Sequence, residues 1–181
     1  ADLLGDDFSA QLGEVAVWSR AQGERLSPLF AQRREQGWVR ECHGDLHLGN
    51  LVEVDGQVMA FDGIEFNPNL RWIDVINEAA FLVMDLEHRG RPDLAWTFLN
   101  TYLSGTGDYA GLAVRKFYCL YRAMVRAKVA GLGGEREGVD AYLRLAGEIA
   151  SPPPPRLTIT FGVWLGQDHR QCRSAPRRCK R

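Results

Sequence analysis

The side chains best suited to chemistry gather in the stretch ECHGDLHLGN, which runs from Glu41 to Asn50. Within it, Asp45 lies five positions before Asn50, and a second carboxylate, Asp62, follows twelve positions after Asn50 in AFDGIEFNP. Carboxylate and amide oxygens are hard ligands, which suit Mg²⁺ bridging phosphates better than Zn²⁺. If the fold brings these three side chains together, the sequence predicts a magnesium site that handles phosphate groups.

A β-hairpin is predicted directly after this stretch. Two short apolar runs, Leu51–Val54 and Gln57–Phe61, are separated by Asp55-Gly56. An Asp-Gly pair is a strong signal for a two-residue hairpin turn, because both central residues of that turn take positive φ values.

The predicted hairpin would gather the candidate ligands. The register set by the turn places Asn50 opposite Phe61, so that Asn50 and Asp62 meet at the open end of the hairpin. Cross-strand neighbours lie roughly 5 Å apart, which lets an amide oxygen and a carboxylate share one cation. Since Asp45 lies on the loop that leads into the first strand, we expect all three at one edge.

Two other interpretations of these residues stay open. Asp and Asn favour turns, so the three candidate ligands can be turn formers alone. His43, Asp45 and His47 alternate and would share one face of a strand, a pattern that suggests a metallophosphoesterase. A two-metal site of that kind needs several further histidines, and the body of the chain adds only His88.

HGDLHLGN resembles the catalytic loop of the aminoglycoside phosphotransferase family and its protein-kinase-like relatives, and AFDGIEFNP resembles the metal-binding Asp-x-Gly motif of that family. The segments LRWIDVINEAAFLVMDLEHRGRPDLAWTFLNTYLSGTGDY and YRAMVRAKVAGL are similar to a bacterial branch of the family. The resemblance covers roughly residues 10–150. It implies the C-terminal lobe of a protein-kinase-like α+β fold, mostly α-helical with one small β-hairpin.

The resemblance also implies a function, an ATP-dependent phosphotransferase acting on a hydroxyl group of a small molecule. Asp45 would accept the hydroxyl proton, and Asn50 and Asp62 would hold Mg²⁺ on the phosphates of ATP. His43 would brace the loop from behind, and Asp74 would hydrogen-bond the loop backbone in a structural role. The acceptor stays open among an aminoglycoside, a sugar, an amino alcohol and an amino-acid hydroxyl.

The N-terminal lobe of such an enzyme, with its phosphate-covering loop and strand lysine, has no counterpart before the loop. The first lysine of the sequence is Lys116. We therefore expect residues 1–150 to be a C-terminal lobe alone, with most of the nucleotide site missing and little or no phosphotransfer by itself. The alternative is a non-catalytic remnant that serves as a binding domain.

Helices must position the hairpin and its loop. Apolar spacing and Gly or Pro punctuation predict helices over residues 72–90, 92–105, 109–130 and 139–149. Before the loop, Ser27-Pro28 is predicted to start a second helix, and the alternative is one longer helix kinked at Pro28.

An arginine stripe is predicted on the helix over residues 109–130. It consists of Arg115, Arg122 and Arg126, with Cys119 between them. We interpret it as a solvated or salt-bridged face, and a role in contacting an anion is the alternative.

Composition and charge narrow the class of protein. A chain of 181 residues can form one domain with a proper core. No apolar run approaches the ~20 residues that span a bilayer, and no signal-peptide pattern occurs, so we expect a cytoplasmic protein without a membrane partner. The four cysteines form no CxxC pair, which favours reduced thiols. Residues 1–150 carry a net charge of −7, which makes them a poor nucleic-acid binder.

The tail differs from the body of the chain. Residues 151–155 are predicted to be a proline-rich linker, and residues 156–181 the start of a P-loop domain, because RLTITFGV is typical of a strand that ends in glycine. The bacterial branch resembles fusions to a P-loop kinase domain. The codons from Trp164 onward, read in a shifted frame, permit Gly-Ser-Gly-Lys-Thr-Thr, so we expect a frameshift product that is disordered after Val163. The alternatives to a frameshift are a disordered basic terminus or a metal site formed by His169, Cys172 and Cys179 of the tail. The nucleotide sequence of the gene tests the frameshift.

Overall fold

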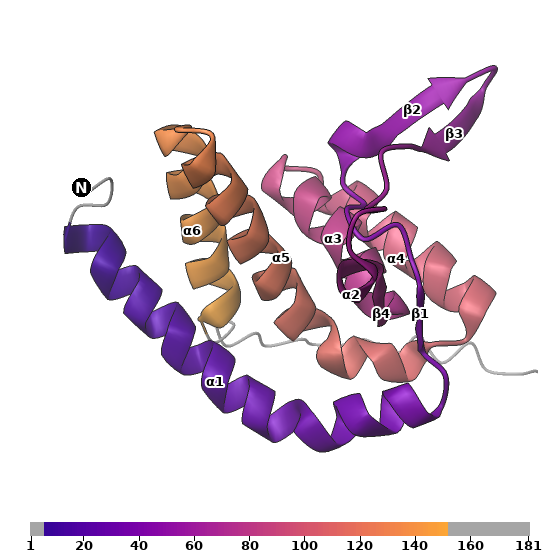
Figure 1. Cartoon of the computed structure of the whole chain (residues 1–181), viewed down its shortest axis with the longest axis horizontal. Coiled ribbons are helices and arrows are strands. Elements are labelled where there is room, and N and C mark those ends of the chain that lie inside the picture. The colour runs from indigo at the N-terminus through magenta and orange to yellow at the C-terminus, as the bar shows by residue number, and fades with distance from the viewer. Residues whose placement is uncertain (1–5, 152–181) are drawn as a thin grey trace, which may run out of the picture.

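The computed structural model of the protein describes residues 6–151, and most of them lie in helices (Figure 1). The helices are α1 (Asp6–Glu35), α2 (Pro68–Arg71), α3 (Val75–His88), α4 (Pro92–Thr106), α5 (Leu112–Leu132) and α6 (Arg136–Ala150). The strands are β1 (Val39–Glu41), β2 (Leu51–Val54), β3 (Gln57–Ala60) and β4 (Trp72–Asp74), and the 3₁₀ turns are η1 (Leu48–Asn50) and η2 (Tyr109–Gly111). The predicted mostly helical fold with a small β-hairpin is confirmed. The tail after Ser151, including the predicted P-loop start, lies outside the described residues.

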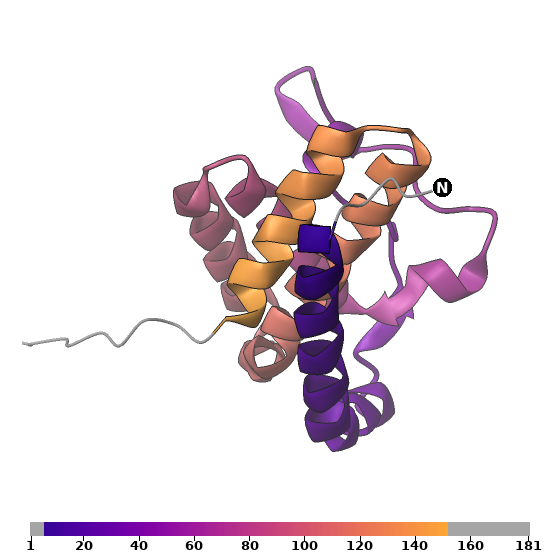
Figure 2. The same ribbon diagram turned by 90° about the vertical axis from the view of Figure 1, so that its left-hand side faces the viewer.

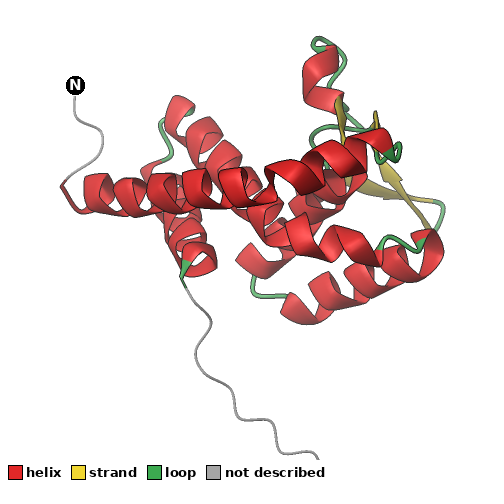
Figure 3. Ribbon diagram, turned by 90° about the horizontal axis from the view of Figure 1, so that it is seen from below, coloured by secondary structure: helices red, strands yellow, loops and turns green. Residues whose placement is uncertain are grey.

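Helix α5 is the centre of the fold. It packs against α3 and α6, while α4 packs on α3, and α1 runs along α6 and α5 (Figures 1 and 2). The core is built from buried apolar side chains of these helices, among them Ile76, Phe81, Met84, Val114 and Leu143. Burial of each such side chain contributes about 1.5–3 kcal/mol. The view in Figure 3 shows the strands gathered at one end of this helical frame. Within residues 6–151, no helix is long and apolar enough to cross a membrane.

The hairpin formed by β2 and β3 has the predicted register, in which Val54 pairs with Gln57. Asp55 and Gly56 take φ values of +51° and +76° in the turn between the strands. Two consecutive positive values are what a primed turn with an Asp-Gly pair requires. The hairpin extends away from the helices (Figure 1), so its turn fixes where the chain returns to the loop that precedes it.

The predicted helix start at Ser27-Pro28 was wrong, because α1 continues through both residues. The alternative of one long helix is confirmed, and its curved path is visible in Figure 1. A proline inside a helix costs about 3 kcal/mol, since it removes one hydrogen bond and clashes with the preceding turn. Packing on both sides offsets this cost: Leu26 and Arg33 are buried, and Phe30 packs its ring against α5.

A second two-stranded sheet was not predicted, so the expectation of a single hairpin was incomplete. Strands β1 and β4 pair antiparallel, with Val39 opposite Asp74 and Glu41 opposite Trp72. The helix expected from residue 72 therefore begins at Val75 instead. β1 and β4 have three residues each, and the hairpin lies between them in the sequence. Strands this short show no clear alternation of apolar and polar residues, so the hydrophobic pattern did not predict them. This pairing holds the start of the loop between β1 and β2 next to the start of α3.

A buried ion cluster holds α1 against the start of α3 and the junction of α4 with α5. Arg33 donates two hydrogen bonds to Asp74 and two to Asp108, with N···O distances from 2.6 to 2.8 Å. Asp74 also accepts a hydrogen bond from the backbone N–H of Ile76, which caps α3. Burial alone would lower the pKa of Arg33, but the two carboxylates outweigh it and raise that pKa. Asp74 is thus structural, but these contacts replace its predicted bond to the loop backbone.

Candidate functional site

Two carboxylates of α3 hold the backbone of the loop between β1 and β2. The Gly44 N–H donates to Glu78 Oε2 at 2.8 Å, and the Leu48 N–H donates to Asp85 Oδ2 at 3.0 Å. Gly44 has a φ of +86°, and a Cβ there would lie 3.0 Å from the carbonyl oxygen of Leu70, so the position requires glycine. Neither acid was predicted as a site residue, although an aspartate inside the apolar run AAFLVMDL is unusual for a core helix.

His43 joins the loop to the end of the hairpin. Its Nε2 lies 2.8 Å from the carbonyl oxygen of Phe61, and its own carbonyl accepts a hydrogen bond from the Ile64 N–H at 2.9 Å. Its Nδ1 accepts from the backbone N–H of Asp45 at 3.3 Å. These contacts require the tautomer with the proton on Nε2, because Nδ1 accepts and Nε2 donates. This geometry agrees with the bracing role predicted for His43.

Asn50 contacts Asp45 through its amide nitrogen. Nδ2 donates to the carbonyl oxygen of Asp45 at 3.0 Å and to its Oδ2 at 3.1 Å. Asn50 is buried, so this orientation of the amide is set by the protein. Because the nitrogen makes both contacts, and residues 6–151 offer Oδ1 no hydrogen bond, the amide oxygen is left to accept a cation.

The neighbours of Asp45 hold the pKa of its carboxyl group below the ordinary value. The largest cause is the hydrogen bond from His47, whose Nε2 lies 3.4 Å from Oδ2, and it outweighs partial burial, which raises the pKa. His47 Nδ1 accepts the Gly49 N–H at 3.0 Å, which places the ring proton on Nε2, and Arg126 Nη1 also lies 3.4 Å from that nitrogen. Asp45 is therefore ionised at neutral pH and able to accept a hydrogen bond from a hydroxyl group.

Asp62 lies directly after the hairpin in a left-handed backbone conformation, with a φ of +60°. Within residues 6–151, Asp55 is the other non-glycine residue with positive φ, and there the turn requires it. Asp and Asn enter this region more readily than other non-glycine residues, but a positive φ outside a turn is uncommon and is often found at functional sites. The Phe61 N–H donates to the carbonyl oxygen of Asn50 at 3.0 Å, so the predicted neighbourhood of Asp62 and Asn50 is confirmed at the backbone.

The chemistry of these donors fits a hard divalent cation. Asn50 Oδ1 and the carboxylate of Asp62, the predicted cation ligands, supply oxygen atoms alone, and the carboxylate of Asp45 lies next to Asn50. In the described part of the chain, no group of three or more His, Cys, Asp or Glu side chains is placed to hold a metal. Both ring nitrogens of His43 and both ring nitrogens of His47 contact protein groups. His88 of α3 stacks on Tyr142 of α6. This arrangement disfavours the metallophosphoesterase alternative.

The arginine stripe of α5 is not one solvated face. Arg122 is buried and donates from Nε to Asn77 Oδ1 at 2.8 Å and from Nη1 to the carbonyl oxygen of Gly44 at 2.8 Å. Arg115, in contrast, lies 3.8 Å from Glu87 in a salt bridge, as predicted for the stripe. Arg122 thus anchors the loop from α5, a contact that no sequence pattern indicated because it joins distant residues.

Cys42, which precedes His43, is expected to be an unreactive thiol. Burial raises its pKa to about 11, with the charge of Glu78 adding to the effect. Since the thiolate is the nucleophile, alkylation by iodoacetamide at pH 8 should be slow in the folded protein and should speed up as the pH approaches 11. Mass spectrometry of the labelled peptides measures this, with the urea-unfolded chain as the control. Labelling of the folded Cys42 at the unfolded rate at pH 8 would contradict it.

A cavity of about 320 Å³ opens beside Asp45. The loop contributes Asp45 to its wall, α3 contributes Asn77, and α5 contributes Tyr121, Arg122 and Lys128. A small molecule in this cavity would therefore lie against the ionised carboxylate that the loop presents.

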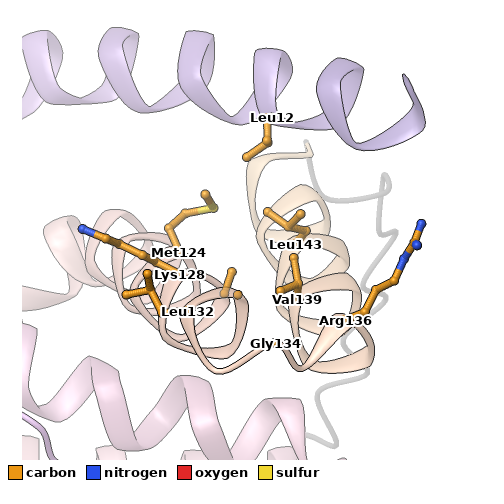
Figure 4. Close-up of a pocket in the computed structure, with 10 residues that line it drawn as sticks. Leu12, Met124, Lys128, Leu132, Gly134, Arg136, Val139 and Leu143 are labelled. Atoms are coloured by element: carbon orange, nitrogen blue, oxygen red, sulfur yellow. The ribbon is translucent and has the colours of Figure 1, made fainter. Parts of the chain in front are cut away.

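A larger cavity, of about 360 Å³, lies between α1, α5 and α6 (Figure 4). Its wall is mostly apolar, with Leu12, Met124 and Leu143 among its residues, and Arg136 extends away from it in Figure 4. Among the residues that the structure describes, no acidic side chain lines it, so none of them could accept a proton from a substrate hydroxyl there. The cavity beside Asp45 is therefore the candidate reaction site.

Comparison with known proteins finds similar sequences in mycobacteria. The chain is 46% identical over 101 residues to an uncharacterized protein of Mycobacterium bovis and to uncharacterized proteins of two strains of Mycobacterium tuberculosis. The match covers 56% of this chain and 20% of each relative. No protein-family model matches the chain, and no solved structure matches it.

Proposed function

We propose that this chain carries the catalytic lobe of an ATP-dependent phosphotransferase that phosphorylates a hydroxyl group of a small molecule. In this proposal, residues 10–150 form the C-terminal lobe of an aminoglycoside-phosphotransferase-like kinase fold, with ATP and Mg²⁺ as cofactors. A second lobe that covers the nucleotide would come from outside this sequence. The mycobacterial relatives extend far beyond the matched segment, which leaves room for such a lobe in them.

The observation that supports the proposal best is the joining of two separate motifs into one site. Asn50 Nδ2 binds Asp45 within the first motif, and His43 and Asn50 bond the backbone on either side of Asp62 in the second. A simple turn does not require Asn50 Oδ1 to lack a hydrogen-bond partner among residues 6–151, nor Asp62 to take a positive φ. A site that holds a cation between them accounts for both features.

The roles of the residues follow from this arrangement. Asp45 would accept a hydrogen bond from the acceptor hydroxyl, orient it for in-line attack, and take its proton as the new P–O bond forms. Asn50 Oδ1 and Asp62 would hold Mg²⁺, which neutralises charge on the phosphates of ATP when it is bound. Because the loop is fixed by α3 and α5, Asp45 and Asn50 are oriented before the substrate arrives.

A metal-binding measurement on the chain tests the proposed site. Mn²⁺ is a paramagnetic stand-in for Mg²⁺ at oxygen sites, and its titration into ¹⁵N-labelled protein should first broaden the amide signals of Asp45, Asn50 and Asp62. Binding is expected to be weak without the nucleotide. Asp62→Asn should weaken it at least about tenfold, since even outer-shell partners of a metal contribute about 10- to 100-fold.

Asp55→Asn is the matched control for this variant. Asp55 and Asp62 both have positive φ, which asparagine tolerates, so neither substitution strains the backbone. The control should bind Mn²⁺ like the unchanged protein. The proposed site is refuted if broadening begins elsewhere in the chain, or if the two variants bind Mn²⁺ equally well.

A further inference from the structure

The cavity beside Asp45 is the place where an acceptor molecule would meet the proposed catalytic carboxylate. Its volume of about 320 Å³ is at the lower end of the range of about 300–1,000 Å³ for small-molecule sites. The loop contributes Asp45, whereas α5 contributes Arg122 and Lys128 to the same wall. One small molecule can therefore contact the carboxylate and both basic side chains at once.

Arg122 has one guanidinium nitrogen left without a partner. Nε binds Asn77 and Nη1 binds the carbonyl oxygen of Gly44, but Nη2 is buried and has no hydrogen-bond partner among residues 6–151. The residue as a whole is 5% exposed, so bulk water does not solvate it freely. A buried donor left unpaired costs about 1–3 kcal/mol, and more when it is charged. Nη2 has almost no solvent-accessible surface, but other atoms of Arg122 line the cavity, so a bound anion would pair with the guanidinium group as a whole.

The charge that lines the cavity favours an anion. Lys128 is exposed and forms no salt bridge within the described residues, and Arg122 adds a second positive charge. Among the described residues, Asp45 is the one acidic residue that lines the cavity, and its proposed partner is the acceptor hydroxyl. Glu78 balances part of the charge of Arg122 but does not line the cavity. A polycationic acceptor such as an aminoglycoside would place ammonium groups against these two cations, which is unfavourable.

We infer that the acceptor is a small hydroxy acid, a molecule with a carboxylate besides the hydroxyl group that is phosphorylated. The carboxylate would pair with the guanidinium group of Arg122 and accept a hydrogen bond from Lys128 Nζ, while the hydroxyl group contacts Asp45. In the transfer, the hydroxyl oxygen bonds to the γ-phosphorus of ATP, the bond to the β,γ-bridging oxygen breaks, and ADP leaves. The hydroxyl proton passes to Asp45. The reacting hydroxyl rests on the proposed function, whereas the recognition of the carboxylate depends on the cavity alone.

Three polyols of equal length that differ at one end test the inference. Gluconate ends in a carboxylate, glucitol in a hydroxymethyl group, and 1-amino-1-deoxyglucitol in an ammonium group. Each is titrated into the ¹⁵N-labelled chain without metal or nucleotide. Gluconate is expected to shift the signals of Gly44, the Asn77 side-chain amide and Arg122 Nε. Its Kd should be at least about tenfold below that of the amine, because a charge pair replaces a charge repulsion.

Matched variants locate the carboxylate. Lys128→Gln should weaken gluconate binding about three- to tenfold, which is the loss of one charge-assisted hydrogen bond at an open site. Lys116→Gln removes the same charge from the same helix but away from the cavity wall, and should change the Kd by less than about twofold. Arg122→Lys should weaken gluconate binding too. If the substitution of the buried Arg122 unfolds the protein, Lys128→Gln alone tests the inference.

The hydroxy-acid inference is overturned if the amine binds as well as gluconate, if gluconate shifts signals elsewhere, or if Lys128→Gln and Lys116→Gln behave alike. The Mn²⁺ titration separates this failure from a failure of the proposed function. Mn²⁺ binding near Asp62 without a preference for gluconate would leave the phosphotransferase and reject the hydroxy acid. Gluconate binding without a cation site at Asp62 would support the recognition of a carboxylate in the cavity and reject the proposed phosphotransferase.

Discussion

Arg33→Met is expected to lower the free energy of unfolding by about 3–5 kcal/mol, because it leaves two buried carboxylates without their counter-charge. Arg33 and Asp74 are 1% and 4% exposed at their side chains, and Asp108 is fully buried. Both acids also make other hydrogen bonds: Asp74 caps α3, and Asp108 accepts a hydrogen bond from the Gly111 N–H before α5. The substitution should therefore loosen α1 from the two central helices as well as remove four hydrogen bonds.

Urea unfolding followed by circular dichroism measures this loss. Arg34→Met is the matched control, because Arg34 is the exposed neighbour of Arg33 on the same helix. It should change the free energy of unfolding by less than about 0.5 kcal/mol, as surface substitutions usually do. Equal midpoints and slopes for the two variants would show that the ion cluster does not hold the fold together.

Asp45→Asn is expected to lower kcat for phosphotransfer by roughly 10²–10⁴-fold, which is the usual contribution of a positioned general base. The amide has the same shape and can still accept the hydrogen bond from Asn50 Nδ2, so the loop should keep its conformation. The substitution removes the ionised oxygen that orients the hydroxyl group. The affinity for the nucleotide should change little, because Asn50 and Asp62 keep the proposed cation ligands.

A longer protein that joins this sequence to a nucleotide-covering lobe is the material for this test. ADP release gives kcat, and titration with a fluorescent nucleotide gives the affinity. The 181-residue chain by itself should release little or no ADP, because half of the nucleotide site would be missing. Asp55→Asn, at the exposed turn of the hairpin, should keep full activity. Retention of kcat in Asp45→Asn would exclude Asp45 as the base.

The hairpin and its flanking residues could be predicted from the sequence because the signal is local. Asp55-Gly56 specifies the turn, the turn specifies the register, and the register places Phe61 opposite Asn50. The position of Asp62 next to Asn50 follows from these steps. The positive φ of Asp62 did not follow, because no turn pattern requires it there.

The contacts that support the loop could not be predicted, because they join residues far apart in the chain. Arg122 reaches Gly44 from α5, and Glu78 reaches it from α3. Asp74 was assigned to the same loop, but the pairing of β1 with β4 and the cap of α3 place it against Arg33. Pro28 shows the same effect, since burial on both sides of it overrides a local helix-breaking signal.

Phosphorus-31 NMR of the longer protein with ATP, Mg²⁺ and gluconate among a mixture of hydroxyl compounds tests the central proposal most directly. We predict that the γ-phosphate signal of ATP disappears while the signals of ADP and one phosphomonoester grow in equal amounts, and that Asp45→Asn and Asp62→Asn stop the change while Asp55→Asn does not. Inorganic phosphate as the sole new product besides ADP would indicate a hydrolase, and unchanged ATP would indicate a non-catalytic binding domain. Either result would contradict the proposed phosphotransferase.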